Sequence, residues 1–464
     1  MSEVGSTTRS ADPDNAERRG AQRVLLLGSL GMFVVALDTT IVNIAFTTIA
    51  GSLHTSTGRL AWVLNAYSLV FAALLIPAGW VADRYGRKRV FLTGLVGFAV
   101  MSALCAAAPN VGVLIAGRGL QAVFAALVVP SSLALILQEF PPAKRPMAVG
   151  TWGSMGAVAA ALAPTTGALL TEYASWRWIF LINVPIAAGM AVFGARVLRE
   201  TRAPAASRSR VPDPVGTVLV AAIPALLSLA LLQGPYWGWS DPRVIGGFVL
   251  GFVLLPVFLW RSAATANPVM DLALFKERRF LLVNVGTLLF ATAFFGLLLS
   301  GVVFLQTEWH YSALRSALAT APGPLVVILL ARPAGRLAGR LGHRRVLFAG
   351  AVAWCVGSGL FAVQAGGYAH WAADWLPGTV FIGIGAALTL PIQPGAAARS
   401  LPPPRFAVGS AINASFRQLG AVLGVSIFVA VQSSAGPAAY VDAFHHVWWA
   451  FAALGLAAGL VVCL

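Results

Sequence analysis

Long apolar runs separated by short polar segments make up almost the whole chain. Fourteen of these runs are long enough to cross a bilayer as a helix, which takes about 20 mostly apolar residues. They lie near residues 24–49, 61–82, 90–108, 112–137, 148–171, 178–198, 214–234, 244–261, 280–305, 315–335, 346–364, 374–395, 407–432 and 446–464. The pattern predicts an all-α integral membrane protein with 14 transmembrane helices.

The polar segments between the runs differ in charge, and this difference predicts the orientation of the chain. Lys and Arg accumulate in cytoplasmic segments. With the N-terminus inside, the inner segments hold most of the basic residues. The outer segments then hold only Arg59, Arg177, Arg243 and Arg315. An even number of helices places both termini in the cytoplasm, and we expect the cell membrane as the location.

A thirteen-residue segment occurs twice, once in each half of the chain. Pro77-Ala-Gly-Trp-Val-Ala-Asp-Arg-Tyr-Gly-Arg-Lys-Arg89 shares its Pro, its two Gly and three of its four basic positions with Pro333-Ala-Gly-Arg-Leu-Ala-Gly-Arg-Leu-Gly-His-Arg-Arg345. One copy alone is typical of any positively charged cytoplasmic loop. Two copies in equivalent loops indicate a duplicated ancestral half. Asp83 of the first copy corresponds to Gly339 of the second.

The repeat also predicts how the chain is divided. We expect a disordered cytoplasmic tail over residues 1–22 and a six-helix bundle over 23–198. A linker with an inserted pair of helices follows over 199–279, and a second six-helix bundle occupies 280–464. The two bundles are expected to be related by pseudo-twofold symmetry. The apolar residues near 270–275 suggest that this part of the linker lies flat at the membrane interface.

Composition supports the membrane class and excludes others. The chain has 464 residues, of which 58% are hydrophobic and 10% charged, whereas a soluble domain carries about a quarter charged residues. The net charge of +16 does not indicate nucleic-acid binding, because the basic residues lie between apolar spans. We expect a monomer in the lipid bilayer with no nucleic-acid partner.

No pattern in the chain indicates catalysis or metal binding. The sequence contains no phosphate-binding Gly-rich loop, no helical pair of zinc-binding histidines and no convincing Ser–His–Asp set. Its three cysteines fall inside apolar runs without the spacing of metal ligands. We therefore expect a protein that is not an enzyme and has no metal or cofactor.

Asp38 is the only acidic residue deep within an apolar run. A carboxylate there costs a few kcal/mol or more unless it is protonated or paired. Asp38 is therefore a candidate proton site, with a structural pairing role as the alternative. Thr39, Thr40 and Asn43 make the same helix segment polar.

Arg118 lies within the fourth apolar run, three residues before Gln121 on the same helix face. A guanidinium keeps its proton, so it must find an anion or water. A neighbouring Arg would favour the charged form of a proton-binding carboxyl. The alternative is that Arg118 extends its side chain to the membrane surface.

The first copy of the repeat resembles the signature loop between helices 2 and 3 of the major facilitator superfamily, with the pattern G-x-x-x-D-R-x-G-R-[KR]. Its matching positions are Gly79, Asp83, Arg84, Gly86, Arg87 and Lys88. The resemblance implies a conformational switch loop that latches the two halves on the cytoplasmic side when the cavity faces outward.

Other segments resemble the fourteen-helix drug:proton antiporters of that superfamily. Residues 37–45 are similar to their first-helix motif, and Arg118–Ala122 is similar to R-x-x-Q-G. The fifth run carries part of their Gly-Pro antiporter stripe, with Gly156, Pro164 and Gly167 in place and alanine at positions 163 and 168. Residues 175–185 and 409–420 also resemble this group.

The resemblance implies export of small amphipathic or cationic organic compounds, such as drugs or antibiotics, driven by inward proton flow. We expect Asn43, Gln121, Phe295, Asn413 and Arg417 to line the substrate cavity. Two alternatives remain open. The chain could transport a polar metabolite with the same fold, or it could be a membrane sensor or scaffold that transports nothing.

Overall fold

The computed structural model describes residues 13–141, 144–202, 213–401, 406–436 and 439–464. Within those ranges every regular element is helical, and 14 helices are long and apolar enough to cross a membrane. This confirms the predicted all-α membrane fold. Residues 1–12 of the predicted tail and residues 203–212 of the predicted linker lie outside the described part.

The first half contains six spans. They are formed by α1 (Pro13–Ile44), α3 (Thr57–Tyr85), α4 (Arg87–Ala106), α5 (Val111–Glu139), α6 (Arg145–Tyr173) and the pair α7 (Trp178–Leu181) and α8 (Asn183–Val197); the short α2 (Phe46–Ser52) follows α1. α1 begins earlier than predicted, so residues 13–22 are helical rather than disordered. Ala, Glu and Arg in this stretch are good helix formers and extend the helix beyond the apolar run.

The second half also contains six spans. They are formed by α11 (Arg278–Thr307), α12 (Ala313–Thr320) with α13 (Pro322–Leu341), α14 (His343–Gln364), η4 (Trp371–Trp375) with α15 (Leu376–Thr389) and α16 (Gln393–Arg399), α17 (Phe406–Ser434) and α18 (Tyr440–Cys463). Two of these spans are interrupted where proline stands. Pro322 begins α13, and Pro391 lies in the turn between α15 and α16. Proline lacks the backbone N–H that continues a helix, but α3, α5 and α6 run through Pro77, Pro130 and Pro164, so proline alone does not set these breaks.

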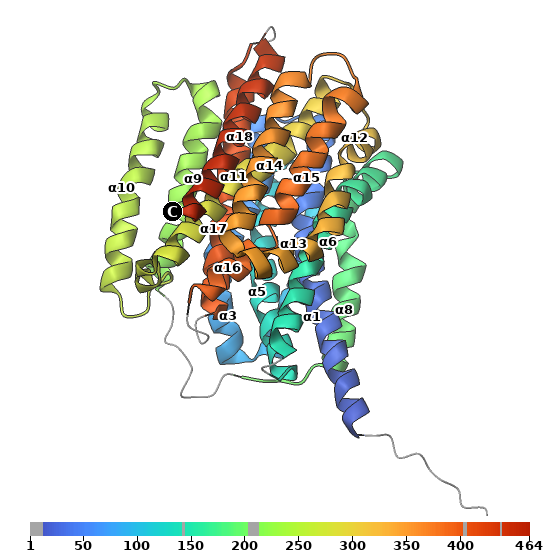
Figure 1. Ribbon diagram of the computed structural model, residues 1–464, viewed down its shortest axis with the longest axis vertical. Coiled ribbons are helices and arrows are strands. Elements are labelled where there is room, and N and C mark those ends of the chain that lie inside the picture. The colour runs from blue at the N-terminus through green and yellow to red at the C-terminus, as the bar shows by residue number, and fades with distance from the viewer. Residues whose placement is uncertain (1–12, 142–143, 203–212, 402–405, 437–438) are drawn as a thin grey trace, which may run out of the picture.

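The inserted pair consists of α9 (Pro214–Trp237) and α10 (Pro242–Ala264), which lie side by side at the edge of the bundle (Figure 1). Arg261 Nε and Nη2 donate to the two carboxylate oxygens of Asp213 at 2.6 and 2.7 Å. This bidentate bond joins the end of α10 to the start of α9 and holds the pKa of the Asp213 carboxyl below its usual range. This ion pair therefore joins α9 and α10 at this end.

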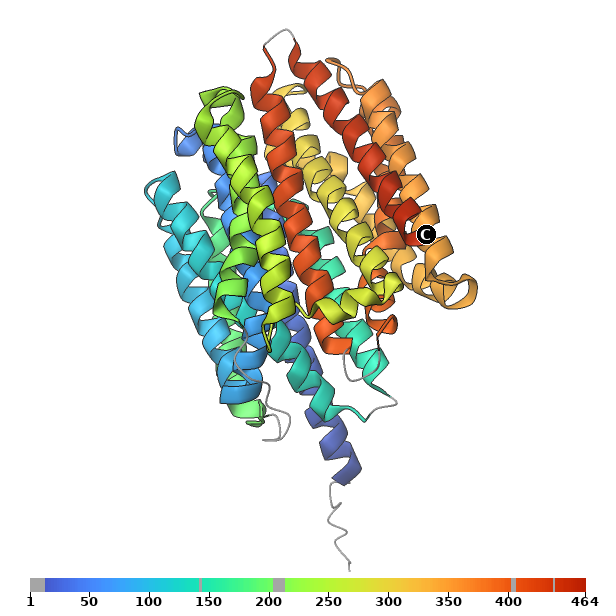
Figure 2. The same ribbon diagram turned by 90° about the vertical axis from the view of Figure 1, so that its left-hand side faces the viewer.

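α9 touches both halves of the molecule. Ser426 of α17 donates to Ser228 of α9 at 3.1 Å, and Asn65 of α3 donates to Ser426 at 2.9 Å. All three side chains are buried. The inserted pair thus packs across the line where the two bundles meet, as the turned view also shows (Figure 2). The domain boundaries at residues 198 and 279 stay predictions.

Glycines let α6 approach α1 closely. A Cβ atom added at Gly167 would lie 2.5 Å from Ile44 and 2.7 Å from Ile41, and one added at Gly156 would lie 2.9 Å from Met32. At Gly167 such distances leave no room for a side chain, whereas the atom near Gly156 is the flexible end of Met32. Gly167 of the predicted stripe therefore lets α6 pack directly against α1.

The two copies of the repeat form equivalent tight turns. Gly86 joins α3 to α4 with φ of 117°, and Gly342 joins α13 to α14 with φ of 87°. Residues with a β-carbon rarely adopt such values. We call the end of the molecule that carries these two turns the basic end.

The segment between α10 and α11 forms the 3-10 helix η3 (Leu272–Lys276). Met270 and Leu274 are buried in an apolar cluster that includes Phe280 of α11 and Ala334 of α13. This part of the linker is therefore packed on the protein at the basic end, and its expected place at the membrane interface stays a prediction.

Candidate functional site

A cavity of about 2330 Å³ lies between the two halves. Most of its lining comes from α1, α3, α5 and α6 of the first half and from α11, α13, α15 and α17 of the second. These are the first, second, fourth and fifth spans of each half. The cavity thus follows the pseudo-twofold arrangement that the repeat predicted.

The lining combines aromatic and polar side chains. Phe294 lies 5.2 Å from Phe295 and 5.9 Å from Trp354, measured between ring centroids, and all three face the cavity. Asn43 and Asn413 add polar groups to the lining. A space of this kind suits a compound with a large apolar body and few polar groups.

The cavity reaches the basic end and is closed at the other. Asp83, Arg87 and Arg399 at the basic end belong to its lining. At the opposite end Thr47 donates to the side-chain oxygen of Gln306, and Gln306 Nε2 donates to the carbonyl of Ile44 at 3.2 Å. These bonds join the two halves across that end.

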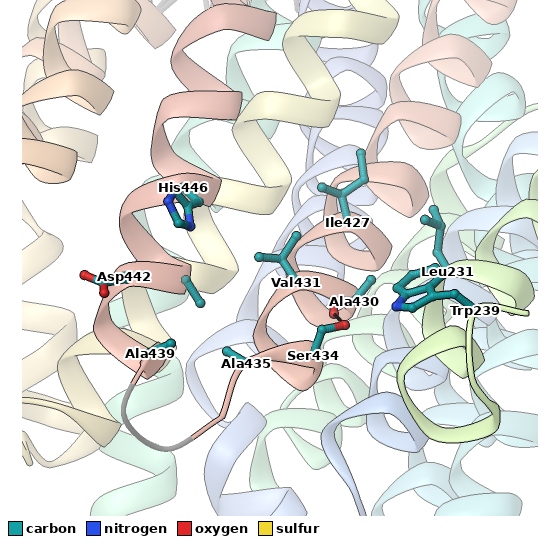
Figure 3. A pocket seen from close by; sticks show the side chains of 11 residues that line it. Leu231, Trp239, Ile427, Ala430, Val431, Ser434, Ala435, Ala439, Asp442 and His446 are labelled. Carbon is teal, nitrogen blue, oxygen red and sulfur yellow. Dashed lines mark hydrogen bonds between the residues drawn. The ribbon is translucent and has the colours of Figure 1, made fainter.

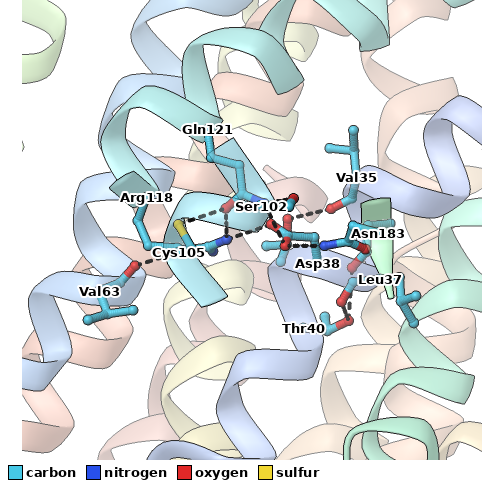
Figure 4. Close-up of polar contacts among 12 residues, drawn as sticks. Val35, Leu37, Asp38, Thr40, Val63, Ser102, Cys105, Arg118, Gln121 and Asn183 are labelled. Atoms are coloured by element: carbon cyan, nitrogen blue, oxygen red, sulfur yellow. Dashed lines mark hydrogen bonds and ion pairs between the residues drawn. The ribbon is translucent and has the colours of Figure 1, made fainter. Parts of the chain in front are cut away.

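Asp38 lies at the centre of a buried polar network inside the first half (Figure 4). Arg118 Nη1 donates to Asp38 Oδ2 at 2.6 Å, and the side chains are 1% and 0% exposed. Asp38 Oδ1 accepts from Gln121 Nε2 at 3.0 Å and from Asn183 Nδ2 at 2.8 Å. The carboxylate therefore ties α1 to α5 and α8.

Arg118 is enclosed rather than directed to a membrane surface. Its Nε donates to the carbonyl of Val63 at 3.3 Å, and its Nη1 also donates to Gln121 Oε1 at 2.6 Å. The guanidinium lies 4.0 Å from the ring centroid of Tyr67, a cation–π distance. The guanidinium thus donates hydrogen bonds in its plane while its face contacts the aromatic ring.

The cavity and the network occupy different faces of α1. Ala36, Thr39, Thr40 and Asn43 line the cavity, whereas Asp38 does not. Their spacing places them on one side of the helix, with Asp38 on the other. Gln121, which we expected in the cavity, also lies in the network and outside the lining.

The sequence analysis missed three members of the surroundings of Asp38: Asn183, Ser102 and Tyr67. Ser102 accepts from Gln121 Nε2 at 2.7 Å. Each is a polar residue within an apolar run, which is the signal that could have found them. Asn183 lies within residues 175–185, the segment that resembles the fourteen-helix antiporters.

Within the described part of the chain, no hydrogen bond or ion pair joins the switch-loop residues to the second half. Arg87 Nη2 donates to Asp83 Oδ1 at 2.7 Å within the first half. The backbone N–H groups of Lys88 and Arg89 at the start of α4, which have no acceptor within the helix, donate to Glu200 at 3.2 and 3.1 Å. Glu200 was not predicted; a carboxylate at a helix start is favourable because it satisfies free N–H groups.

Most of the residues predicted for the cavity, and some of those predicted for the switch loop and the Gly-Pro stripe, lie in the cavity lining. Asn43, Phe295, Asn413 and Arg417 line the cavity, and so do Gly79, Gly156 and Pro164. Gly167 is buried against α1.

A second pocket of about 470 Å³ lies on the flank of the molecule between α9, α17 and α18 (Figure 3). Asp442 and His446, one turn apart on α18, face it together with mostly apolar side chains such as Leu231 and Val431. No residue of the buried network lines it. The large cavity is therefore the candidate for transport.

Comparison with known proteins places this architecture in a family. The chain matches the Major Facilitator Superfamily over residues 28–302 and 283–464. This chain belongs to the Major Facilitator Superfamily. It is a multi-pass membrane transporter and not an enzyme, as the sequence predicted.

Several curated relatives are similar over most of the chain. The methylenomycin A resistance protein of Bacillus subtilis (strain 168) is 33% identical, covering 87% of this chain and 86% of that protein. The tetracenomycin C resistance and export protein of Streptomyces glaucescens is 31% identical, covering 88% and 76%. The multidrug export protein EmrB of Escherichia coli (strain K12) is 32% identical, covering 71% and 64%.

Solved structures show the same fold at low sequence identity. An auto-inhibited peptide transporter of the POT family has a TM-score of 0.69 and 19% identity, with 96% of each chain covered. A point mutant of the nucleoside transporter NupG has a TM-score of 0.64 and 14% identity, with 96% and 99% covered. At this identity the likeness concerns the fold alone.

Proposed function

We propose that this protein exports small amphipathic organic compounds of the drug or antibiotic kind from the cytoplasm, driven by inward proton flow. It lies in the cell membrane with both termini and the basic end in the cytoplasm. The basic end then carries the cytoplasmic opening of the cavity, and the structure corresponds to the inward-facing state.

Export is supported by the cavity and by the named relatives. The cavity is large, aromatic and open to the side from which an exported compound would come. The similar proteins carry names of resistance to, or export of, methylenomycin A, tetracenomycin C and multiple drugs. A wide cavity lined by aromatic and other apolar side chains, with polar and charged groups among them, is the observation that carries this part of the proposal.

Proton coupling is supported by the position of Asp38. Protonation would remove its charge and weaken its bond to Arg118, because an ion pair becomes a neutral donor–acceptor contact. Arg118 would then be left as a buried charge without a counter-ion, which is costly. α1 carries Asp38 on one face and cavity residues on the other, so a shift of α1 would link proton binding to the cavity.

The test replaces Asp38 by asparagine, which keeps the shape of the side chain and removes the titratable group. In proteoliposomes with an imposed pH gradient, we expect Asp38→Asn to bind substrate but to lose export driven by the gradient. The substrate is chosen beforehand as a compound to which the wild-type protein gives resistance in an efflux-deficient host. Asp442→Asn, at the flank pocket, is the matched control and should export normally.

The variant is also expected to be less stable, since breaking a buried ion pair on one side costs about 3–5 kcal/mol. Retained substrate binding shows that a loss of coupling is not a loss of folding. Export by Asp38→Asn at the wild-type rate under the gradient would refute proton coupling through this residue. Failure of the wild-type protein to give resistance to any compound of a broad panel would refute export itself.

A further inference from the structure

We propose that the transported compound carries a negative charge on an apolar or aromatic body, and that Arg417 pairs with this charge in the cavity. The inference rests on the proposed export function and narrows its substrate class. The sequence led us to expect amphipathic or cationic compounds, and the charges around the cavity favour an anion.

The position of Arg417 is the first reason to expect a negatively charged compound. It lies in the interior of α17, about 16 Å along the helix from Phe406 at 1.5 Å of rise per residue. Its side chain lines the cavity and is partly buried. Among the residues that the structure describes, no hydrogen bond or ion pair reaches its guanidinium.

Three other arginines of this protein have a carboxylate partner, which Arg417 lacks among the described residues. Arg118, Arg87 and Arg261 each donate to a carboxylate at 2.6–2.7 Å. A guanidinium stays charged and requires an anion or water when it leaves the bulk solvent. Arg417 therefore offers an unfilled set of donors to whatever enters the cavity.

The neighbouring amide cannot fill this role. Asn413, one turn before Arg417, donates to Asn284 Oδ1 at 3.2 Å and to Thr287 Oγ1 at 2.8 Å in α11. Its NH₂ group is thus committed to holding α17 against α11. This contact fixes the helix that presents Arg417 and leaves the guanidinium as the free donor at this point of the lining.

The balance of charge is the second reason. The cavity lining contains five basic and two acidic residues: Arg87, Lys276, Arg332, Arg399 and Arg417, with Asp83 and Asp271. Asp83 is already paired with Arg87, and Asp271 accepts from the backbone N–H of Ala273 at 2.9 Å. An excess of one charge sign raises the local concentration of ligands of the other sign.

The orientation of the chain in the membrane does not by itself explain the basic residues of the cavity lining. Basic residues at the cytoplasmic opening, such as Arg399, are expected from the distribution of Lys and Arg around membrane spans. Arg417 lies well inside a span, where an unpaired charge is costly. Phe294, Phe295 and Trp354 supply the apolar part of the same cavity.

The experiment uses two probes with the same aromatic frame. 1-Anilinonaphthalene-8-sulfonate is an anion, and N-phenyl-1-naphthylamine lacks the sulfonate and is neutral. Binding to the full-length protein in nanodiscs is measured by fluorescence, with the signal of empty nanodiscs subtracted. We expect the wild-type protein to bind the anion more tightly than the neutral probe.

Arg417→Gln should weaken binding of the anionic probe by about 10- to 100-fold, the range for losing a hydrogen bond to a charged group. Binding of the neutral probe should stay unchanged, which also shows that the variant is folded. Arg417→Lys should recover part of the affinity, because it keeps the charge without the planar fork. Arg243→Gln, in α10 and outside the cavity lining, is the control for losing an arginine elsewhere and should leave the affinity unchanged.

Two results would overturn the inference: equal binding of the two probes by the wild-type protein, or full affinity of Arg417→Gln for the anion. Neither result bears on export, which is measured separately as resistance given by the wild-type protein. If the protein exports compounds but does not distinguish the probes, the substrate class is wrong and the proposed function stands. If it gives no resistance to any compound, the proposed function fails, whatever the probes show.

Discussion

At the scale of single residues, the first half isolates one ion pair from water and lipid. Asp38 and Arg118 are 0% and 1% exposed, so their attraction is little screened. Gln121 and Asn183 use further lone pairs of the carboxylate. A buried pair is tolerated only when such additional bonds are made. The network therefore satisfies the carboxylate of Asp38 in this state.

Arg118→Lys tests the geometry of that pair. Lysine keeps the positive charge, but one ammonium cannot reproduce the bonds to Asp38, Gln121 and the carbonyl of Val63 at once. We expect a shifted pH–rate profile of export or a loss of about tenfold or more in rate, as for the loss of about 1.4 kcal/mol. The measurement is the rate of export in proteoliposomes over a series of pH values.

An unchanged profile would mean that Arg118 only fills space beside Tyr67 and Phe180. Arg177→Lys provides the control, because Arg177 is likewise beside an aromatic ring, that of Trp176, but lies outside the network. Its profile should match the wild type.

At the scale of elements, the contact of α6 with α1 depends on having no side chain at Gly167, which lies against Ile41 and Ile44. Gly156 lies beside the flexible end of Met32 and also lines the cavity. Gly150 and Gly153 face the cavity, and a Cβ atom added at either position would have nothing within 4 Å. The same helix thus uses its small residues for close packing on one side and for open space on the other.

Gly167→Ala should therefore destabilise the protein, because the new methyl group would lie 2.5 Å from Ile44. Overpacking of this kind costs about 1–3 kcal/mol. Gly150→Ala in the same helix should be neutral or slightly stabilising, since Ala is favoured over Gly in a helix by about 0.5–1 kcal/mol. Thermal unfolding in detergent compares the two. Equal midpoints would contradict close packing at Gly167.

The switch loop makes a second prediction at this scale. Asp83 now pairs with Arg87 of its own half, and the latch to the other half is expected only when the cavity faces outward. Such a latch forms and breaks in each cycle, so it should contribute only a few kcal/mol. Gly339 has no carboxylate, so the second loop cannot form the symmetric latch.

Asp83→Asn should lower export and shift the protein toward the inward-facing state, whereas Gly339→Asp should change turnover little. Labelling of single cysteines in the cytoplasmic part of the cavity measures this shift directly. If Asp83→Asn changes neither labelling nor export, the loop serves only to set the orientation of the chain.

At the scale of the whole molecule, the cavity between the two halves reaches the basic end, and hydrogen bonds join the halves at the opposite end. Thr47 of the first half and Gln306 of the second are joined there by a hydrogen bond. α9 of the inserted pair is bonded to α17 of the second half through Ser228 and Ser426, and it packs against α3 of the first half, where a Cβ atom added at Gly58 would lie 2.9 Å from Tyr236. A change of state must break the first contact and rearrange the surroundings of the second.

Cross-linking tests this arrangement. Thr47→Cys with Gln306→Cys, in a background without the three native cysteines, should react with a short bifunctional thiol reagent. Export should stop when the link forms and return when a reducible link is cleaved. Each single variant treated with the reagent is the control. Export that continues at full rate with the link in place would show that these ends need not separate.

The sequence by itself determined the membrane class, the number of spans and the duplicated halves. These follow from apolar run length, from the distribution of Lys and Arg and from the repeat at residues 77–89 and 333–345, all of which are local properties of the chain. It also singled out Asp38 and Arg118, because a charge inside an apolar run is visible without a structure. The breaks near Pro322 and Pro391 were not predicted, and proline alone could not have shown them, because α3, α5 and α6 continue through Pro77, Pro130 and Pro164.

Only the tertiary structure decided which polar residues meet. Asp38, Gln121 and Asn183 come from α1, α5 and α8, and no periodicity along one helix shows that they share one site. The same limit explains why Gln121 was expected in the cavity and lies in the network. Arg417 is the opposite case, because only the packed structure shows that the charge faces a cavity and that no described residue neutralises it. Pairing across helices depends on which faces are packed together, and this is a property of the whole fold.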